Sequence, residues 1–193
     1  LLTNVILATL SPVILCPAMN VNMYKNQIVQ ENLERLRNRG FIIVEPSEGS
    51  LACGWEGKGR LPEIPDIVHE IEKTLSPKDY RGERVLVTAG ATREFIDSVR
   101  FISNPSSGKM GYSLAKEGLM RGAEVVLVTG KTNLAPPLGA KVIDVVSAGD
   151  MYESVMEYLD WSTIVIKAAA VGDYTPSEKI NGKIKKDENS MIL

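Results

Sequence analysis

The sequence predicts an α/β fold with a mainly parallel sheet, because short apolar runs alternate with longer amphipathic segments along the chain. A polar stretch containing Pro and Gly, SPKDYRGER at residues 76–84, separates two differently organised halves and predicts a domain boundary. With 44% hydrophobic and 24% charged residues, the 193-residue chain has the composition of an ordinary globular protein with a core.

The first half predicts two strands and two helices. The apolar runs Val13–Cys16 and Phe41–Val44 predict strands, and Gln27–Asn38 predicts a helix that Gly40 ends. A second helix is expected over Pro62–Leu75. Its expected buried stripe consists of Ile64, Ile67, Val68 and Ile71.

In the second half the strand–turn–helix rhythm restarts. We expect strands at 85–87, 124–128 and 163–168, helices at 107–121 and 150–159, and a long loop over 88–106. Two successive strand–helix–strand units form half of a doubly wound sheet, whose ligands bind beyond the carboxyl ends of the strands.

Charge and cysteine content exclude several classes of function. A formal net charge of −2 argues against non-specific binding to nucleic acid, which needs a basic face. No apolar run reaches the length of a membrane span. Cys16 and Cys53 lie far apart without clustered histidines, which favours free thiols in a reducing cytoplasm over a disulfide framework or a zinc site.

Two segments of the second half have the residue types of an anion site. Gly90, in the turn TAGATR after the first strand, would let backbone approach a ligand or would merely connect two elements; G-x-G-x-x-G is absent. NPSSGK at 104–109 places two hydroxyls, a glycine and a lysine where a helix begins. That pattern fits phosphate binding at the helix N-terminus or a plain serine cap, and it is not a Walker A loop.

These segments resemble a known enzyme family in order and spacing. VRFISNPSSGKMG at 99–111, with VTAGATRE before it and AAAVGDY and KIKK after it, is similar to phosphopantothenate–cysteine ligases. In the first half, PAMN at 17–20 with Met23, and ACGWEGKGR at 52–60, resemble FMN-dependent phosphopantothenoylcysteine decarboxylases, which are commonly fused to the ligase.

The resemblance implies a domain plan. Residues 1–76 would form the C-terminal part of a flavodoxin-like decarboxylase domain, 77–84 a linker, and 85–193 the N-terminal part of a Rossmann-like, doubly wound ligase domain. The family's catalytic histidine and much of its FMN site would precede Leu1, so we expect a segment of a longer protein that alone has neither full activity.

For the ligase half, the resemblance implies a reaction of coenzyme A synthesis. Phosphopantothenate is activated by a nucleotide, CTP or ATP, with Mg²⁺, and cysteine then displaces the nucleoside monophosphate from the acyl-nucleotide. Asn104 would bond the acyl-cytidylate, Arg100 would support its loop, and Lys183 would meet the triphosphate. The other implied nucleotide-binding residues are Gly90, Ser106, Ser107, Gly108, Ala169, Ala170 and Asp173.

Each role has a simpler structural alternative. Lys183 lies in a run typical of a solvated loop, Asp173 could cap a turn, and Arg100 could pair with a surface carboxylate. Ala169 and Ala170 could be the small-residue end of a buried strand.

For the decarboxylase half, the resemblance implies that Asn20 binds the substrate carboxylate and that Cys53 donates a proton in the reductive step. Met23 would help to clamp the substrate or would lie in the core, and Cys53 could be only a small buried thiol. Glycines around Cys53 favour a flap over a site. Cys16 is assigned to packing.

Two other functions stay open at this stage. VLVTAG followed by a helix also opens many NAD(P)-binding oxidoreductases, and decarboxylase-like flavoproteins also serve as non-catalytic regulatory subunits. The family resemblance implies FMN, CTP and Mg²⁺ as cofactors or co-substrates, small-molecule substrates, and a homo-oligomer with ligase dimers and a trimer-based decarboxylase assembly. The sequence identifies no metal ligand.

Overall fold

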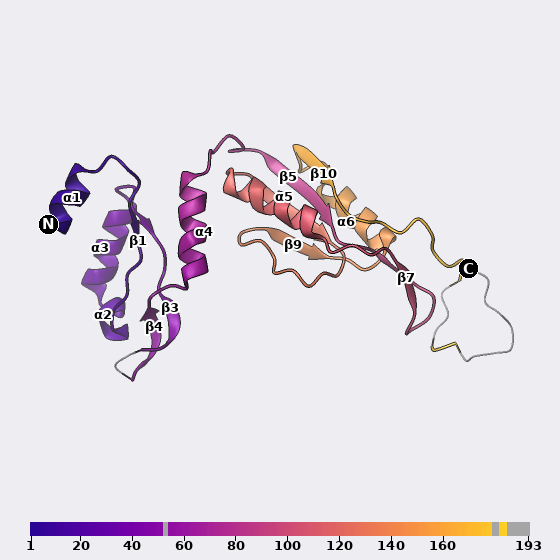
Figure 1. Ribbon diagram of the computed structural model, residues 1–193, viewed down its shortest axis with the longest axis horizontal. Helices are drawn as coiled ribbons and strands as arrows, with labels where there is room; N and C mark the ends of the chain where they lie inside the picture. The colour runs from indigo at the N-terminus through magenta and orange to yellow at the C-terminus, as the bar shows by residue number, and fades with distance from the viewer. Residues whose placement is uncertain (52–53, 179–181, 185–193) are drawn as a thin grey trace. The chain divides into compact units, whose positions relative to one another are not determined.

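The computed structural model describes residues 1–51, 54–178 and 182–184, and the chain divides into two compact units, Leu1–Ser76 and Pro77–Leu193 (Figure 1). Cys53 lies outside the described residues. In the described part of the chain, no helix is long and apolar enough to span a membrane.

The first unit combines short helices with two small sheets. Strands β1 (Ile14–Leu15) and β2 (Ile42–Ile43) pair in parallel, and β3 (Ser47–Ser50) pairs antiparallel with β4 (Glu56–Arg60). The helices are α1 (Leu2–Ala8), α2 (Val21–Lys25), α3 (Gln27–Arg37) and α4 (Ile64–Leu75).

Two asparagines fix where α2 and α3 begin. The side chain of Asn20 accepts a hydrogen bond from the N–H of Asn22, and that of Asn26 accepts one from Ile28. Each bond satisfies an N–H group that the first helical turn leaves without a partner. The PAMN segment is thereby held in a defined turn at the start of α2.

The predicted buried stripe on α4 is wrong for the described residues. Ile64, Val68 and Ile71 are exposed to 72%, 44% and 41%, and only Ile67 is partly buried. The amphipathic pattern correctly predicts the helix, but a stripe is buried only where another element covers it. No other described helix or strand packs extensively against α4.

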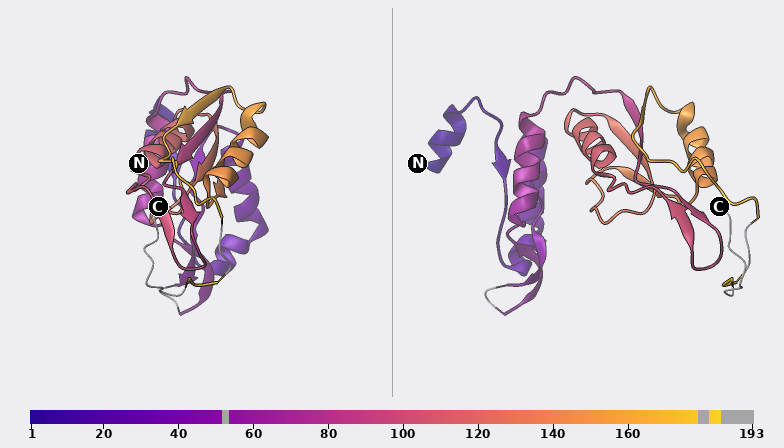
Figure 2. Two further views of the ribbon diagram at one scale, coloured as in Figure 1. Left: turned by 90° about the vertical axis from the view of Figure 1, so that its right-hand side faces the viewer. Right: turned by 45° about the vertical axis from the view of Figure 1, so that its right-hand side comes forward.

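The second unit is built on a four-stranded parallel sheet in the order β10-β5-β8-β9. The strands are β5 (Arg84–Ala89), β8 (Glu124–Thr129), β9 (Lys141–Asp144) and β10 (Ile164–Lys167). Helices α5 (Lys109–Met120) and α6 (Ala148–Leu159) cover opposite faces of the sheet (Figures 1 and 2). This arrangement confirms the predicted α/β class.

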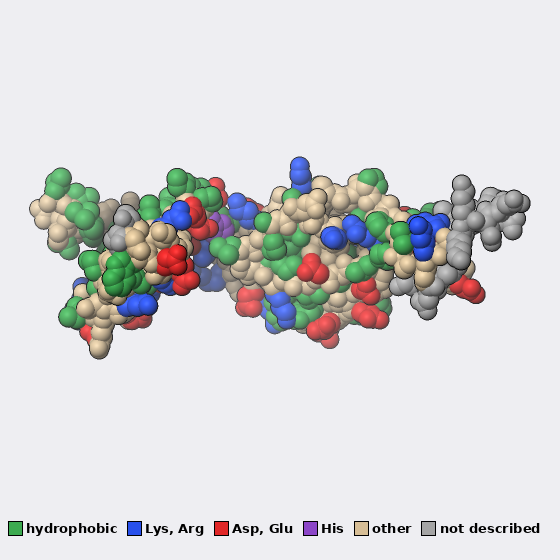
Figure 3. Space-filling view, turned by 90° about the horizontal axis from the view of Figure 1, so that it is seen from below, with side chains coloured by type: hydrophobic (Ala, Val, Ile, Leu, Met, Phe, Trp, Pro, Cys, Tyr) green, Lys and Arg blue, Asp and Glu red, His purple; other side chains and the backbone are tan. Residues whose placement is uncertain are grey.

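The period of two along the strands divides the core between the two helices. Val85, Val87 and Leu127 pack with α5, whereas Leu86 and Val126 pack with α6. All five side chains are nearly or fully buried, as expected for strands covered on both faces. The face shown in Figure 3 carries interspersed acidic and basic side chains.

Three features of this unit differ from the sequence prediction. The predicted loop over 88–106 contains an antiparallel hairpin of β6 (Arg93–Phe95) and β7 (Phe101–Ser103), and β9 was not predicted. Helix α5 begins at Lys109 instead of Ser107, because Gly108 has a φ of +74° and cannot continue a helix.

The segment predicted as a linker is part of the second unit. Lys78 donates to the carbonyl of Met120 at 2.6 Å, Asp79 pairs with Arg121, and Tyr80 packs on the core. These contacts attach residues 78–80 to the C-terminal end of α5, although their polar composition is that of a connector.

Candidate nucleotide site

The loops at the carboxyl ends of the central strands of the second unit meet through closely packed glycines. A Cβ placed on Gly108 would lie 2.7 Å from Cγ2 of Thr132 and 3.3 Å from the backbone nitrogen of Gly90. A Cβ on Gly90 would lie 2.8 Å from the carbonyl oxygen of Gly130, and both Gly90 and Gly108 have positive φ. Glycine is therefore required here for close approach and for backbone conformation.

The N-terminus of α5 lies within this group. The hydroxyl of Ser106 accepts from the N–H of Gly108 at 3.3 Å, and that of Ser107 accepts from Lys109 at 3.5 Å. These are long bonds, and the helix has no side-chain cap at its N-cap residue. The hydroxyls thus lie at the start of the helix, where the N–H groups can bind either a cap or an anion.

The loop after β10 is tied to the end of β5 by two threonines. Thr88 Oγ1 accepts from the N–H groups of Ala168 and Ala169, and Thr92 Oγ1 accepts from Gly172 at 2.8 Å. Both threonines are buried. They bond the N–H groups of Ala169 and Gly172 beyond the sheet ladder, whereas the N–H of Ala168 is shared with the carbonyl oxygen of Thr88.

Ala170 completes the same connection. Its N–H donates to the carbonyl of Gly90 at 2.7 Å, and it forms an isolated parallel bridge with Ala91. The small side chains at 168–170 therefore follow directly from the sheet into a loop that lies against the Gly90 turn.

Asn104 bridges two of the predicted segments. Its Nδ2 donates to the carbonyl oxygen of Val171 at 2.9 Å, which connects the loop before α5 to the loop after β10. Asn104 and Asp173 are both exposed. Hydrogen bonds and close glycine contacts thus bring together the Asn104 loop, the Gly90 turn and the 168–173 loop.

The segment that contains Lys183 is held by the turn between β6 and β7. The guanidinium of Arg100 donates to the carbonyl of Ile184 at 2.7 Å, and Asp97 accepts from the N–H of Ile184 at 3.1 Å. Arg100 was expected to support the Asn104 loop or to pair with a surface carboxylate. In the structure its guanidinium bonds the lysine segment and lies 3.3 Å from the buried carboxylate of Asp97, and its role toward the Asn104 loop stays a prediction.

Asp97 is fully buried, and its carboxylate accepts hydrogen bonds from three backbone N–H groups. Burial acts against ionisation, but the N–H groups of Arg100, Val99 and Ile184 outweigh it and hold the pKa of the carboxyl below its ordinary value. The pKa is lowered because a carboxylate that accepts several backbone N–H bonds is stabilised in its charged form.

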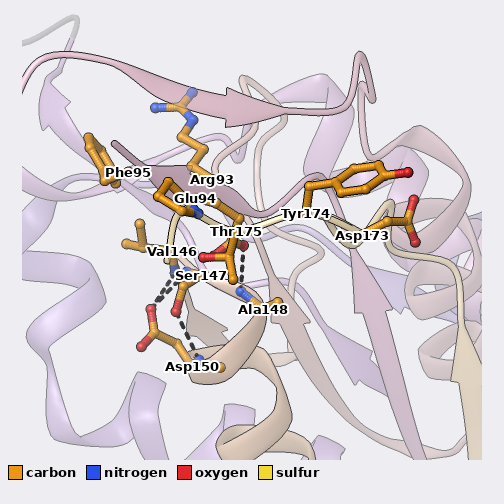
Figure 4. Close-up of a pocket in the computed structure, with 13 residues that line it drawn as sticks. Arg93, Glu94, Phe95, Val146, Ser147, Ala148, Asp150, Asp173, Tyr174 and Thr175 are labelled. Atoms are coloured by element: carbon orange, nitrogen blue, oxygen red, sulfur yellow. Dashed lines mark hydrogen bonds between the residues drawn. The ribbon is translucent and has the colours of Figure 1, made fainter. Parts of the chain in front are cut away.

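A cavity of about 680 Å³ lies beside the 172–176 segment and the N-terminus of α6 (Figure 4). Asp173 lines it, but its other walls come from the β6 strand and from the start of α6. The first N–H groups of α6 are already bonded: Glu94 accepts from Ala148, and Ser147 and Asp150 form a capping box. These bonds occupy two of the N–H groups that an anion at this helix N-terminus would use.

The first unit has a separate cavity of about 510 Å³ beside the PAMN segment. Asn20, Gly59 and Arg60 line it, and a Cβ on Gly59 would lie 2.3 Å from the carbonyl oxygen of Met19. Met23 is 58% exposed and does not line this cavity, so the core alternative for Met23 is wrong. Cys16 is a half-buried free thiol directly after β1, and its assignment to packing stays a prediction.

The cavity of the first unit fits part of a flavin or substrate site. It is lined by the Asn20 amide and by one cation, Arg60, which pairs with Glu63 at 3.1 Å. A flavin phosphate needs more donors than this set offers. The described residues therefore fit the edge of such a site.

The sequence analysis missed the polar residues that join the loops. Thr88, Thr92, Glu94 and Asp97 are buried although all four belong to polar types that usually lie outside. A signal was present, because polar side chains directly after an apolar strand of a parallel sheet lie at its ligand-binding edge. Among the described residues, no group of three or more His, Cys, Asp or Glu side chains could hold a metal ion.

Comparisons with known proteins agree with the two units. Residues 80–193 match the family model "DNA/pantothenate metabolism flavoprotein C-terminal domain", and residues 1–76 match the flavoprotein family. The coenzyme A biosynthesis bifunctional protein CoaBC of Bacillus subtilis is 47% identical over 199 residues, which cover 100% of this chain and 48% of that protein. That of Vibrio cholerae is 46% identical over 193 residues, with 100% and 48% covered.

A solved structure, the C-terminal domain of a CoaBC protein, is 52% identical and covers 51% of this chain and 50% of that one, with a TM-score of 0.49. The sheet order and the family matches define a Rossmann-like α/β unit that follows part of a flavoprotein. The chain belongs to the family of the DNA/pantothenate metabolism flavoproteins, the CoaBC family. It spans about half the length of the curated relatives that it matches.

Proposed function

We propose that the second unit binds a nucleoside triphosphate, CTP, and uses it to join 4′-phosphopantothenate to cysteine. The observation that carries the proposal is that three motifs far apart in sequence meet at one edge of the sheet: the Gly90 turn, the Asn104–Gly108 loop and the 168–173 loop. The relatives are named as bifunctional proteins of coenzyme A biosynthesis, which agrees with this reaction.

The chemistry requires positioning and charge neutralisation. The carboxylate of phosphopantothenate attacks the α-phosphorus of CTP, a P–O bond to the β-phosphate breaks, and pyrophosphate leaves with its electron pair. The cysteine amine then attacks the acyl carbon, CMP leaves, and the amine loses a proton. Both steps bring anions or leaving groups together, so oriented donors and a cation are more useful than a covalent nucleophile.

The proposed roles come from the family resemblance, and the close approach of the Gly90, Asn104–Gly108 and 168–173 segments supports them. Ser106, Ser107 and the N–H groups at the start of α5 receive phosphate, and Gly90 and Gly108 allow its close approach. Asn104 donates to the acyl-cytidylate, and the exposed ammonium of Lys183 meets the triphosphate. Ala169 and Ala170 leave room for the nucleotide, and Asp173 accepts from it.

A Mg²⁺ ion would be held mainly by the nucleotide. Mg²⁺ keeps several waters and binds through substrate phosphates with one or two carboxylates. That mode suits a site in which the described residues contain no cluster of ligands.

The first unit is proposed to take part in FMN-dependent decarboxylation of 4′-phosphopantothenoylcysteine. The flavoprotein match and the cavity at Asn20 support this proposal. When bound, the flavin would supply the redox chemistry, while Asn20 would donate to the substrate carboxylate and Cys53 would protonate the reduced product. Met23 would act only from outside the cavity, at the exposed face of α2. The protein is further proposed to be a cytoplasmic homo-oligomer.

Replacing Lys183 with Ala should weaken CTP binding about 10- to 100-fold, because one charge-assisted contact to phosphate is lost. Calorimetric titration of CTP with Mg²⁺ into the natural protein that contains this chain measures the effect. The matched control is Lys116→Ala, which removes an exposed lysine from α5 and should leave the affinity unchanged. Equal CTP affinities for wild type and Lys183→Ala would remove the triphosphate role, and tighter binding of NAD(P) than of CTP would favour an oxidoreductase.

A further inference from the structure

The turn between β6 and β7 contains a carboxylate whose two oxygens bind different segments. Asp97 Oδ1 accepts from the N–H groups of Val99 and Arg100 at 2.8 and 2.6 Å, within the turn itself. Asp97 Oδ2 accepts from the N–H of Ile184 at 3.1 Å, 87 residues further along the chain. One oxygen therefore shapes the hairpin, and the other holds a distant segment.

Further contacts from the same turn hold both sides of Lys183. Arg100 donates to the carbonyl of Ile184 at 2.7 Å, so the backbone of Ile184 is bonded at its N–H and at its C=O. Before the lysine, the N–H of Ser98 lies 3.5 Å from the carbonyl oxygen of Gly182. Lys183 itself is exposed and sits between the two held residues.

We propose that Asp97 is a positioning residue, which holds the Lys183 segment in place through the backbone N–H of Ile184. The expected effect of Asp97 on nucleotide binding rests on the proposed function, in which Lys183 contacts the triphosphate. The hydrogen bonds that hold Gly182 and Ile184 to the turn, called the clamp below, are observed in the structure. Because Asp97 is fully buried, its proposed role is exerted through the backbone of Ile184 and not by contact with the nucleotide.

The burial of Asp97 makes this contact specific. Its side chain is fully buried, and a buried carboxylate is stable only where its oxygens are bonded. Arg100 lies 3.3 Å from Oδ2 and balances the charge from the solvent side. A long lysine side chain gains little from a phosphate unless its backbone is already ordered, because ordering the segment costs conformational entropy.

The substitution Asp97→Asn separates the two functions of the carboxylate. With its oxygen at the Oδ1 position, Asn can still accept from Val99 and Arg100, since Asn is a favoured residue for such turns. Its NH₂ group then faces the N–H of Ile184 and the guanidinium of Arg100, and two donors cannot bond to each other. The hairpin is kept, and the Lys183 segment is released.

Two measurements on the natural protein that contains this chain test the inference. Amide exchange of Ile184, followed by NMR, should become faster in Asp97→Asn, while the amides of β6 and β7 keep their protection. The affinity for CTP with Mg²⁺ should fall about 10-fold or more. Asp160→Asn, which makes the same change at the exposed C-terminal end of α6, should alter neither quantity.

A double-mutant cycle distinguishes positioning from general damage. If Asp97 acts through Lys183, then Asp97→Asn should cause no further loss of CTP affinity in the Lys183→Ala background. Full additivity of the two losses would overturn the inference, and so would unchanged Ile184 exchange or unchanged CTP affinity in Asp97→Asn. A wild-type protein that does not bind CTP would instead show that the proposed function has failed, while the exchange experiment would still report on the clamp.

Discussion

Gly111→Ala is expected to destabilise the second unit by about 2 to 3 kcal/mol, although Gly→Ala stabilises an open helix by up to about 1 kcal/mol. Gly111 lies in α5, where the helix rests directly on β5. A Cβ there would lie 2.5 Å from Cβ of Ala89 and 2.9 Å from the carbonyl oxygen of Thr88. Both neighbours belong to the central strand, so the helix itself must move away from the sheet.

Amide exchange of Leu86 and Leu127 in the natural protein that contains this chain measures the loss, because these buried strand positions open with the whole unit. The matched control is Gly149→Ala in α6, where a Cβ would make only an ordinary contact of 3.6 Å with Ser147 Oγ. That variant should be neutral or up to about 1 kcal/mol more stable. Equal stabilisation of both variants would show that α5 does not pack as closely as described.

Asn104→Ala is expected to lower the rate of acyl-cytidylate formation about 100-fold or more, the usual loss when one oriented donor is removed from a reacting centre. The side-chain amide makes one observed contact and one proposed contact. It donates to Val171, which holds the loop before α5 against the loop after β10, and it donates to the developing acyl-cytidylate. Removing it therefore disturbs the chemical step more than the binding of CTP.

Rapid-quench measurement of acyl-cytidylate from CTP and phosphopantothenate, without cysteine, gives this rate. The expected signature is a reduced rate with a CTP affinity within a few-fold of wild type, in contrast to Lys183→Ala, which should weaken binding. Protection of the β5 amides checks that the fold is kept. An Asn104→Ala protein that forms the intermediate within threefold of the wild-type rate would contradict the assigned role.

The framework of the second unit could be predicted because its strands are covered on both faces. β5 and β8 each contain an unbroken apolar run, which predicts a strand covered on both faces. The apolar residues of α6 recur with a helical period, which predicts a helix. The hairpin of β6 and β7 escaped prediction because its buried members include Glu94 and the adjacent turn includes Asp97. Burial of a carboxylate depends on donors from distant segments, here Ala148 and Ile184, which no local pattern contains.

In the first unit, prediction of strands and of burial from the sequence failed for another reason. β3 and β4 have the sequences SEGS and EGKGR, which contain no apolar side chain. The alternation of apolar and polar residues that predicts a strand is therefore absent. The α4 stripe shows the reverse case, since its period predicts the helix correctly and its burial wrongly. Amphipathicity is a property of the segment, whereas burial is a property of what packs on it.

The candidate site was predicted as a set of motifs without contacts between them. The order of the motifs suggested a shared ligand, and the parallel sheet explains why Gly90 and the 168–170 segment meet, because both follow carboxyl ends of neighbouring strands. The link from Arg100 to the Lys183 segment could not be derived in this way. It depends on the length and twist of a hairpin that the sequence did not reveal.

Release of pyrophosphate from CTP tests the central claim most directly. The natural protein that contains this chain is mixed with CTP, Mg²⁺ and 4′-phosphopantothenate in the absence of cysteine, in a single turnover. The account predicts one pyrophosphate per active site, dependent on phosphopantothenate, and release of CMP only when cysteine is added. Release of inorganic phosphate with CDP, or no pyrophosphate from a protein that binds CTP, would contradict it.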